Sequence, residues 1–128
     1  MAKLTALQRH FLTFCADDYT GLESALRKVE KAHADASPME QRARTLELIR
    51  EMLGRGYIQA GDLPGAGESW TPWPLSTDEI IARVATEWEK LGKERSDLID
   101  IVWFVSTTEG DRILAEDQER NVLKEPDR

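Results

Sequence analysis

The sequence is poor in the residues that build disulfides and metal sites. Its 128 residues include one cysteine and two histidines. A single cysteine cannot form an internal disulfide, and two histidines without paired Cys or His spacing do not predict a zinc site. The scarcity of cysteine also favours a reducing compartment. We therefore expect a cytoplasmic protein with no metal and no cofactor.

Long apolar runs and nucleotide-binding glycine motifs are also missing. No apolar stretch approaches the roughly 20 residues that span a bilayer. The first helix-like segment could be mistaken for a signal peptide, but Gln8, Arg9 and His10 interrupt its apolar part and favour an amphipathic helix. The glycines within 54–56 and 65–67 fit neither a P-loop nor a dinucleotide-binding motif. The sequence thus predicts neither a membrane protein nor a nucleotide-binding enzyme.

Charge is abundant but unevenly distributed. The net charge is −7. Residues 1–60 hold nine Lys/Arg and eight Asp/Glu, a net of +1, whereas residues 61–128 hold eight Lys/Arg and sixteen Asp/Glu, a net of −8. An acidic surface repels phosphates and attracts basic proteins. The second half of the chain therefore favours a basic protein partner.

Apolar residues make up 41% of the chain, which is enough to form the core of one compact domain. We expect this domain to cover residues 1–120 and residues 121–128 to form a frayed tail. Helical spacing predicts a first helix over about 4–16. Thr20 and Glu23 fit a capping box for a second helix with Leu22, Ala25, Leu26, Val29 and Ala32 on one face, and the alternative is one element over 4–34 bent at Gly21.

The later elements follow from capping and strand signals. They are a helix over 38–53 started by Ser37 and Pro38, a strand over 57–60, a loop over 61–75, a helix started by a capping box at Ser76–Glu79, a strand over 98–105, and a last helix capped by Thr107 or Thr108. The strand over 98–105 is almost continuously apolar, so we expect it to be buried on both faces or nearly so. The pattern predicts an α+β protein, mainly α, with a small sheet of two or three antiparallel strands.

Two segments resemble the second half of a winged-helix domain. LELIREMLGRGYIQAG, residues 46–61, is similar to a recognition helix, its glycine exit and the first wing strand. VWFVSTTEGDRIL, residues 102–114, is similar to the returning strand and its Thr-x-x-Gly cap. The resemblance implies a winged-helix-like helical domain. This chain departs from the pattern because a whole helix, rather than a short turn, separates the two strands.

Candidates for catalysis are few. A catalytic thiol needs a nearby base, whereas Cys15 lies on an apolar helix face that suits core packing. His10 and His33 lie on polar faces. Three pairs of acids fit solvated or helix-capping roles better than a desolvated acid–base pair: Asp17-Asp18, Asp78-Glu79 and Glu116-Asp117. We expect no catalytic residue and no enzyme.

Tryptophan suggests a binding function. Trp88 and Trp103 fall on apolar faces and are expected in the core. Trp70 and Trp73 lie in the Pro-Gly loop, where they either fold back onto the domain or anchor a partner. Carboxylates near such anchors would steer a basic protein. The candidate partner-binding residues are Glu68, Trp70, Trp73, Asp78, Glu79 and Glu87.

The leading interpretation is a non-enzymatic protein-binding domain. The chain is similar in type to small acidic bacterial immunity proteins, which implies a protein that neutralises a basic toxin domain by occluding its active-site cleft. The alternative is a winged-helix transcriptional regulator. Its DNA-binding residues would lie in the first turns of helix 38–53. They are Gln41, Arg42, Arg44 and Thr45.

Overall fold

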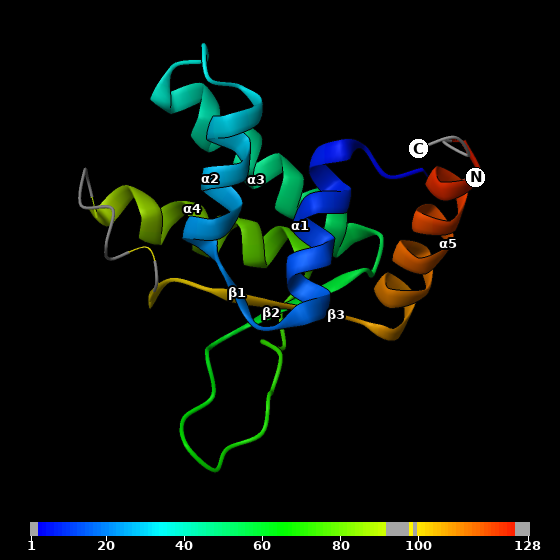
Figure 1. Cartoon of the computed structure of the whole chain (residues 1–128). Helices are drawn as coiled ribbons and strands as arrows, with labels where there is room; N and C mark the ends of the chain where they lie inside the picture. Colours follow the sequence, from blue (N-terminus) through cyan, green and yellow to red (C-terminus); the bar gives the residue numbers. More distant parts are fainter. Residues whose placement is uncertain (1–2, 92–97, 99, 125–128) are drawn as a thin grey trace.

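The computed structural model describes residues 3–91, 98 and 100–124. Within these residues the elements are α1 (Ala6–Asp17), β1 (Thr20–Gly21), α2 (Leu22–Ala32), α3 (Pro38–Gly54), β2 (Ile58–Gly61), α4 (Thr77–Leu91), β3 (Trp103–Ser106) and α5 (Thr108–Lys124). The chain is mainly helical with a small three-stranded antiparallel sheet, which confirms the predicted fold class. Helices α1 to α4 gather on one side of the sheet, and the loop between β2 and α4 projects on the other (Figure 1).

The sheet has the strand order β1-β3-β2, so that β3 is its central strand. Phe104 in β3 lies opposite Thr20 in β1 and opposite Ala60 in β2. Both pairings are antiparallel. β2 and β3 are therefore direct neighbours.

Hydrogen bonds at the helix starts explain why α3 and α4 begin where the sequence predicts. The Ser37 hydroxyl accepts the Glu40 N–H at 3.1 Å. Ser76 and Glu79 form a reciprocal capping box, with N···O distances of 3.1 Å and 2.8 Å. Each bond satisfies a backbone donor that has no partner inside the helix. Both predicted starts are confirmed.

The start of α2 differs from the prediction. Gly21 is the N-cap and makes no side-chain cap bond. Thr20 instead pairs with Phe104 in the sheet, and its hydroxyl donates to the Asp18 carbonyl at 3.2 Å. The predicted capping box and the alternative bent helix are both wrong, because long-range pairing with β3 places a two-residue strand between α1 and α2.

The predicted strand over 98–105 is shorter and less buried than expected. It begins at Trp103 and ends at Ser106, and Ile99 of the predicted strand lies outside the described residues. Phe104 is fully buried, but Trp103 and Val105 are only half-buried, so just one face of the strand contacts the core. The prediction of burial on both faces, and of Trp103 in the core, is wrong. The sequence before Trp103 is apolar because it contributes to the core: Leu98 and Val102 are buried, although neither lies in a strand.

The core lies between the inner face of the sheet and helices α1 to α4. Phe11 of α1 meets Phe104 of β3 edge to face, with ring centroids 5.8 Å apart. Trp88 of α4 is 7% exposed and Cys15 is 3% exposed, which confirms their predicted burial. α5 stands to one side and packs against α1 (Figure 1). It continues to Lys124, four residues into the segment expected to be frayed, whereas residues 125–128 lie outside the described part of the chain.

Candidate protein-binding surface

The four residues considered for DNA reading lie in the first turns of α3, but they do not form a free face. Thr45 is fully buried, and its hydroxyl donates to the Gln41 carbonyl at 2.8 Å. The side-chain amide of Gln41 donates to the His33 carbonyl at 3.0 Å. Arg44 is exposed but forms an ion pair with Glu40 at 3.3 Å. Three of the four candidates thus form hydrogen bonds or an ion pair within α3 and the turn before it. They are Gln41, Arg44 and Thr45.

The fourth candidate is bound to α4, which lies against α3. The guanidinium of Arg42 donates to the Ala85 carbonyl at 2.9 Å and lies 5.3 Å from the centre of the Trp88 ring. Further along α3, Arg50 forms an ion pair with Asp78 at the start of α4. α4 therefore partly covers Arg42 and provides an ion-pair partner for Arg50, which stays exposed.

Trp73, one of the two loop tryptophans, folds back into the core. It is 8% exposed, and its backbone N–H donates to the Ala60 carbonyl at 2.9 Å. The guanidinium carbon of Arg83 lies 3.8 Å from the centre of its ring. Among the described residues, its indole N–H has no hydrogen-bond partner. Trp73 is therefore not available as a surface anchor.

Trp70, the other loop tryptophan, is half-buried and lies against Gln59 and Gly61 of β2. Its indole N–H donates to the Gln59 side chain at 3.0 Å. Its ring lies 5.5 Å from that of Tyr19, with 32° between the planes. Tyr19 is 37% exposed. The two rings form a partly open aromatic pair that joins the loop to the chain just before β1.

The predicted carboxylates are exposed and spread along the loop and α4. Glu68 accepts the Gly65 N–H at 2.7 Å and closes a turn of the loop. Asp78 and Glu79 hold the start of α4, through Arg50 and the capping box respectively. Glu87 lies near Lys90 at 3.6 Å. Asp78, Glu79 and Glu87 place exposed negative charge on α4 beside the cations Arg83 and Lys90, and Glu68 places it on the loop, but most of these acids also have a structural role.

Sequence reasoning missed a hollow next to the aromatic pair. It has a volume of about 290 Å³. Its lining includes Asp17, Asp18, Tyr19, Trp70, Val105 and Ser106. The Tyr19 N–H donates to one oxygen of Asp18 at 2.7 Å. The acid pair at the end of α1 is visible in the sequence, but nothing there connects that pair with Trp70, which is far along the chain.

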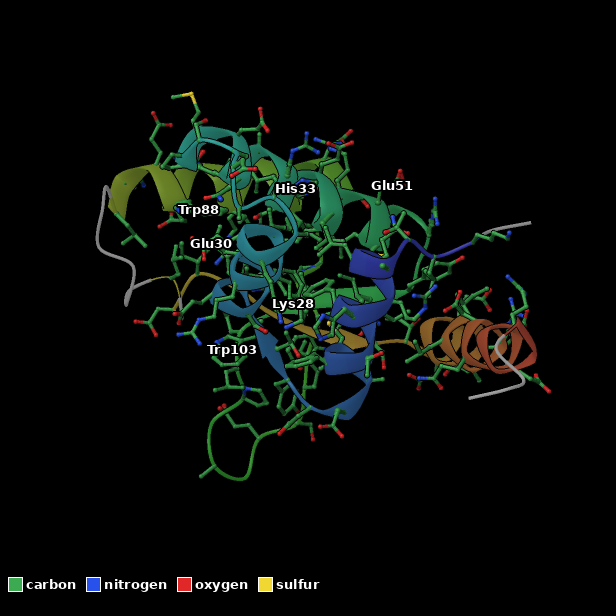
Figure 2. The ribbon with its side chains drawn as sticks, turned by 45° about the horizontal axis from the view of Figure 1, so that its top comes forward. Lys28, Glu30, His33, Glu51, Trp88 and Trp103 are labelled. Carbon is green, nitrogen blue, oxygen red and sulfur yellow. The ribbon has the colours of Figure 1, made fainter. Side chains whose placement is uncertain are left out.

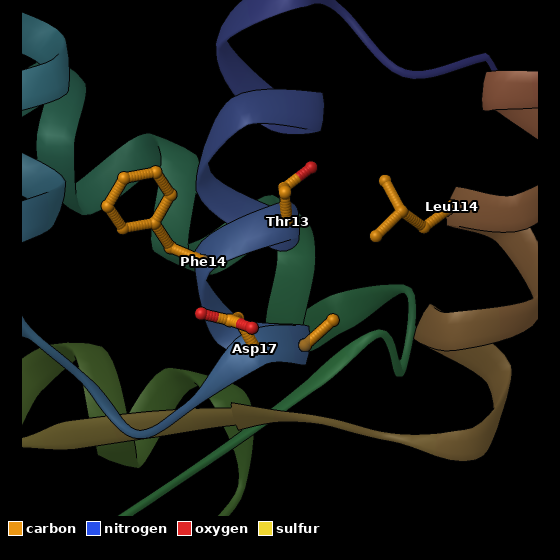
Figure 3. Close-up of a pocket in the computed structure, with 5 residues that line it drawn as sticks. Thr13, Phe14, Asp17 and Leu114 are labelled. Carbon is orange, nitrogen blue, oxygen red and sulfur yellow. The ribbon is translucent and has the colours of Figure 1, made fainter.

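The hollow adjoins a second one between α1 and α5 (Figure 3). This second hollow has a volume of about 310 Å³ and is lined by Thr13, Phe14, Asp17 and Leu114, among others. Phe14 is 45% exposed. Ala16 and Asp17 line both hollows, so the end of α1 separates the two.

Cys15 also borders the first hollow, but it is an unreactive thiol. Burial raises the pKa of Cys15 to about 12, and the smaller opposing effects of the Thr20 hydrogen bond and the charge of Lys28 do not offset it. A thiol with such a pKa is protonated and non-nucleophilic near neutral pH. Lys28 extends between α2 and α1 (Figure 2), and its ammonium lies 3.4 Å from the centre of the Phe14 ring. Partial burial lowers the pKa of Lys28.

Within residues 3–91, 98 and 100–124, no three or more His, Cys, Asp or Glu side chains are placed to hold a metal ion. No helix of this part of the chain combines the length and apolar character needed to cross a bilayer. Comparison of the chain with protein-family models, with curated proteins and with solved structures finds no match. Its function must therefore be argued from its own geometry and charge.

Proposed function

We propose that this chain is a non-enzymatic protein-binding domain with a winged-helix-like frame, and that its acidic surface contacts a basic protein partner. The contact between α4 and α3 carries the proposal. Arg42 donates to Ala85 and is half-buried against α4, and Arg50 forms an exposed ion pair with Asp78, so both cations have partners within the molecule. In a helix-turn-helix protein the corresponding side chains would be free to reach base edges.

The loop after β2 supports the same proposal. Residues 57–82 contain no Lys or Arg. A wing that follows a DNA backbone draws its affinity from cations that replace phosphate counterions. Here the loop carries Asp62 and Glu68, and both are exposed. A surface of this charge favours association with a basic protein and opposes approach to phosphates.

The most specific form of the proposal is an immunity protein. A toxin domain that cleaves nucleic acid binds its substrate in a cationic cleft. Carboxylates on α4 and the loop would take the place of the substrate phosphates, and Trp70 would add apolar contact. Glu79 and Glu87 would steer the encounter from α4, and Glu68 from the loop. Trp73 has no part in this contact because it is buried.

The proposal is tested by comparing two labelled probes, an arginine-rich peptide and a duplex DNA of random sequence. Fluorescence anisotropy would be measured at about 50 mM and about 200 mM salt, a range over which phosphate contacts weaken strongly. We expect binding of the peptide, weakened by salt, and no binding of the duplex. A glutamate-rich peptide is the matched control and should not bind. Steep, salt-sensitive binding of the duplex without binding of the basic peptide would overturn the proposal.

The immunity form has its own test, because an immunity protein must abolish the effect of its toxin. If a toxin-like gene lies beside this one, co-expression of the two proteins should restore the growth that the toxin alone prevents. A neighbour product that binds the chain without any effect on toxicity would support a protein-binding domain of another kind.

The second candidate function is a DNA-binding regulator. One observation favours it: α2 and α3 pack against each other and are joined only by residues 33–37, as in a helix-turn-helix pair. Arg27 and Lys31 are exposed on α2. Binding of the duplex probe in the same experiment, abolished by Arg44→Ala, would favour this function instead.

A further inference from the structure

We propose that the hollow at the end of α1 receives an arginine side chain of the partner protein. This inference rests on the proposed function, because it names the chemical group of the basic partner that one site would bind. The site combines an aromatic pair, two carboxylates and the end of a helix around one opening of about 290 Å³.

The aromatic pair provides the first element of recognition. Tyr19 precedes β1 and Trp70 lies in the loop after β2, and their rings lie 5.5 Å apart at 32°. The Trp70 indole N–H donates to the Gln59 side chain at 3.0 Å, which orients the ring. The ring also packs closely over Gly61, where an added Cβ would lie 2.9 Å from it. A fixed and partly exposed aromatic face attracts a cation through the ring quadrupole.

Negative charge provides the second element. Asp17 is the last residue of α1, and its side chain makes no hydrogen bond or ion pair with any other described residue. Asp18 uses one oxygen for the Tyr19 N–H. The carbonyl end of α1 adds the partial negative charge of a helix C-terminus. A cation in the hollow would therefore meet favourable charge from both the side chains and the backbone.

The β3 side of the hollow is polar. Ser106 lines the hollow from β3, and its hydroxyl donates to Asp111 of α5 at 2.6 Å, so the Asp111 carboxylate lies one hydrogen bond behind the lining. The lining thus combines two carboxylates with a hydroxyl. Among cationic side chains, arginine fits this combination best. Its planar guanidinium stacks on aromatic rings and binds carboxylates through two parallel N–H groups, whereas the lysine ammonium is a compact and strongly hydrated charge.

The probe for the test is N-acetyl-argininamide, with N-acetyl-citrullinamide as a neutral analogue of nearly the same shape. Binding would be followed in proton–nitrogen NMR spectra by the indole signal of Trp70 and the amide signals of Tyr19 and Ser106. We expect saturable shifts with the arginine compound and none with the citrulline compound. Equal shifts with both compounds, or shifts spread over α4 instead of these signals, would overturn the inference.

Two double variants separate the hollow from the general acidity of the protein. Asp17→Asn with Asp18→Asn removes both lining charges, while the new amide oxygen at position 18 can still accept the Tyr19 N–H. Asp62→Asn with Glu89→Gln removes the same number of charges from exposed positions outside the hollow. We expect about tenfold weaker binding in the first variant, which is a loss of roughly 1.4 kcal/mol of binding free energy, and less than twofold change in the second. Equal weakening in both would contradict a localised site.

The failure of this inference can be told apart from the failure of the proposed function. If the arginine-rich peptide binds the Asp17→Asn, Asp18→Asn variant as tightly as the unmodified protein, the hollow is not the arginine site but the protein still binds a basic partner. If the arginine compound shifts the NMR signals of the hollow while the arginine-rich peptide does not bind, the hollow binds arginine but the proposed function is wrong.

Discussion

Gly110 in the first turn of α5 lies directly against the carbonyl of Tyr57, and a Cβ at position 110 would overlap that oxygen. The same carbonyl accepts the Thr107 N–H at 3.0 Å. The Thr107 hydroxyl donates to the Gly56 carbonyl at 2.6 Å and accepts the Gly110 N–H at 3.0 Å. The Thr-x-x-Gly motif thus fastens α5 to the chain entering β2. Threonine provides the hydrogen bonds and glycine provides the room.

This contact predicts that Gly110→Ala destabilises the protein. The new methyl group would overlap a backbone atom that cannot rotate away, so α5 must shift. We expect the free energy of unfolding to fall by about 1–3 kcal/mol, the usual range for overpacking. Urea denaturation followed by circular dichroism would measure it. Gly54→Ala is the control, because a Cβ there meets nothing within 4 Å, and it should leave stability unchanged or slightly raised.

Two arginines on α3 test the contact with α4. Arg42→Ala removes the hydrogen bond to Ala85 and the packing on Trp88, so we expect a loss of about 1–2 kcal/mol. Arg44→Ala removes only an exposed ion pair with Glu40, which is worth about 0.5 kcal/mol or less. Chemical denaturation of both variants would show the difference. Equal and small losses would mean that α4 does not hold Arg42 in solution.

Cys15 predicts a dependence of stability on alkaline pH. Burial raises the pKa of this thiol from 9.0 to about 12, so the folded state holds the proton more tightly than the unfolded state. The stabilisation is complete below about pH 9 and is lost as the pH rises toward 12. Unfolding should become easier by up to about 1.4 kcal/mol per pH unit in this window.

The Cys15→Ala variant isolates this effect. Its stability should fall less steeply between about pH 9 and about pH 11 than that of the unmodified protein. Lys28 titrates in the opposite sense because burial lowers its pKa, and in the Cys15→Ala variant the smaller raising effect of the Cys15 charge on that pKa is also lost. The comparison therefore measures Cys15 together with its coupling to Lys28. Parallel pH profiles for the two proteins would contradict the burial of the thiol.

Trp73 predicts a contrast between two substitutions. Trp73→Ala opens a cavity in the core and should cost about 3–5 kcal/mol. Trp73→Phe keeps most of the apolar volume and removes an indole N–H that has no partner among the described residues, so its cost should be about 1 kcal/mol or less. Thermal and urea denaturation would compare them. If Trp73→Ala folds with unchanged stability, the tryptophan is a surface residue.

Local signals explain the parts of the fold that could be predicted. The starts of α3 and α4 were correct because Ser37 and Ser76 satisfy backbone donors within three residues, which a sequence window can show. β1 was missed because Thr20 owes its strand conformation to Phe104, which is far along the chain. The predicted beginning of β3 was wrong because a run of apolar residues indicates burial and not strand conformation. Leu98 and Val102 are buried without forming a strand.

The candidate surface could be predicted only in part. The loop and the acids of α4 were found from composition, but no local pattern distinguishes the two loop tryptophans. The fold separates them, since Trp73 enters the core and Trp70 stays beside Tyr19. The hollow at the end of α1 joins side chains from α1, the loop and β3. Such a site depends on tertiary contacts between segments that are distant in the chain.

Gly61 and Trp103 stand opposite each other in the sheet. The chain therefore leaves the sheet and returns to it at the same pair of residues, with α4 in between. The same segment carries Trp70 at the surface and contributes Trp73 and Trp88 to the core. Substitutions that change the partner-facing loop are thus coupled to the folding of the frame.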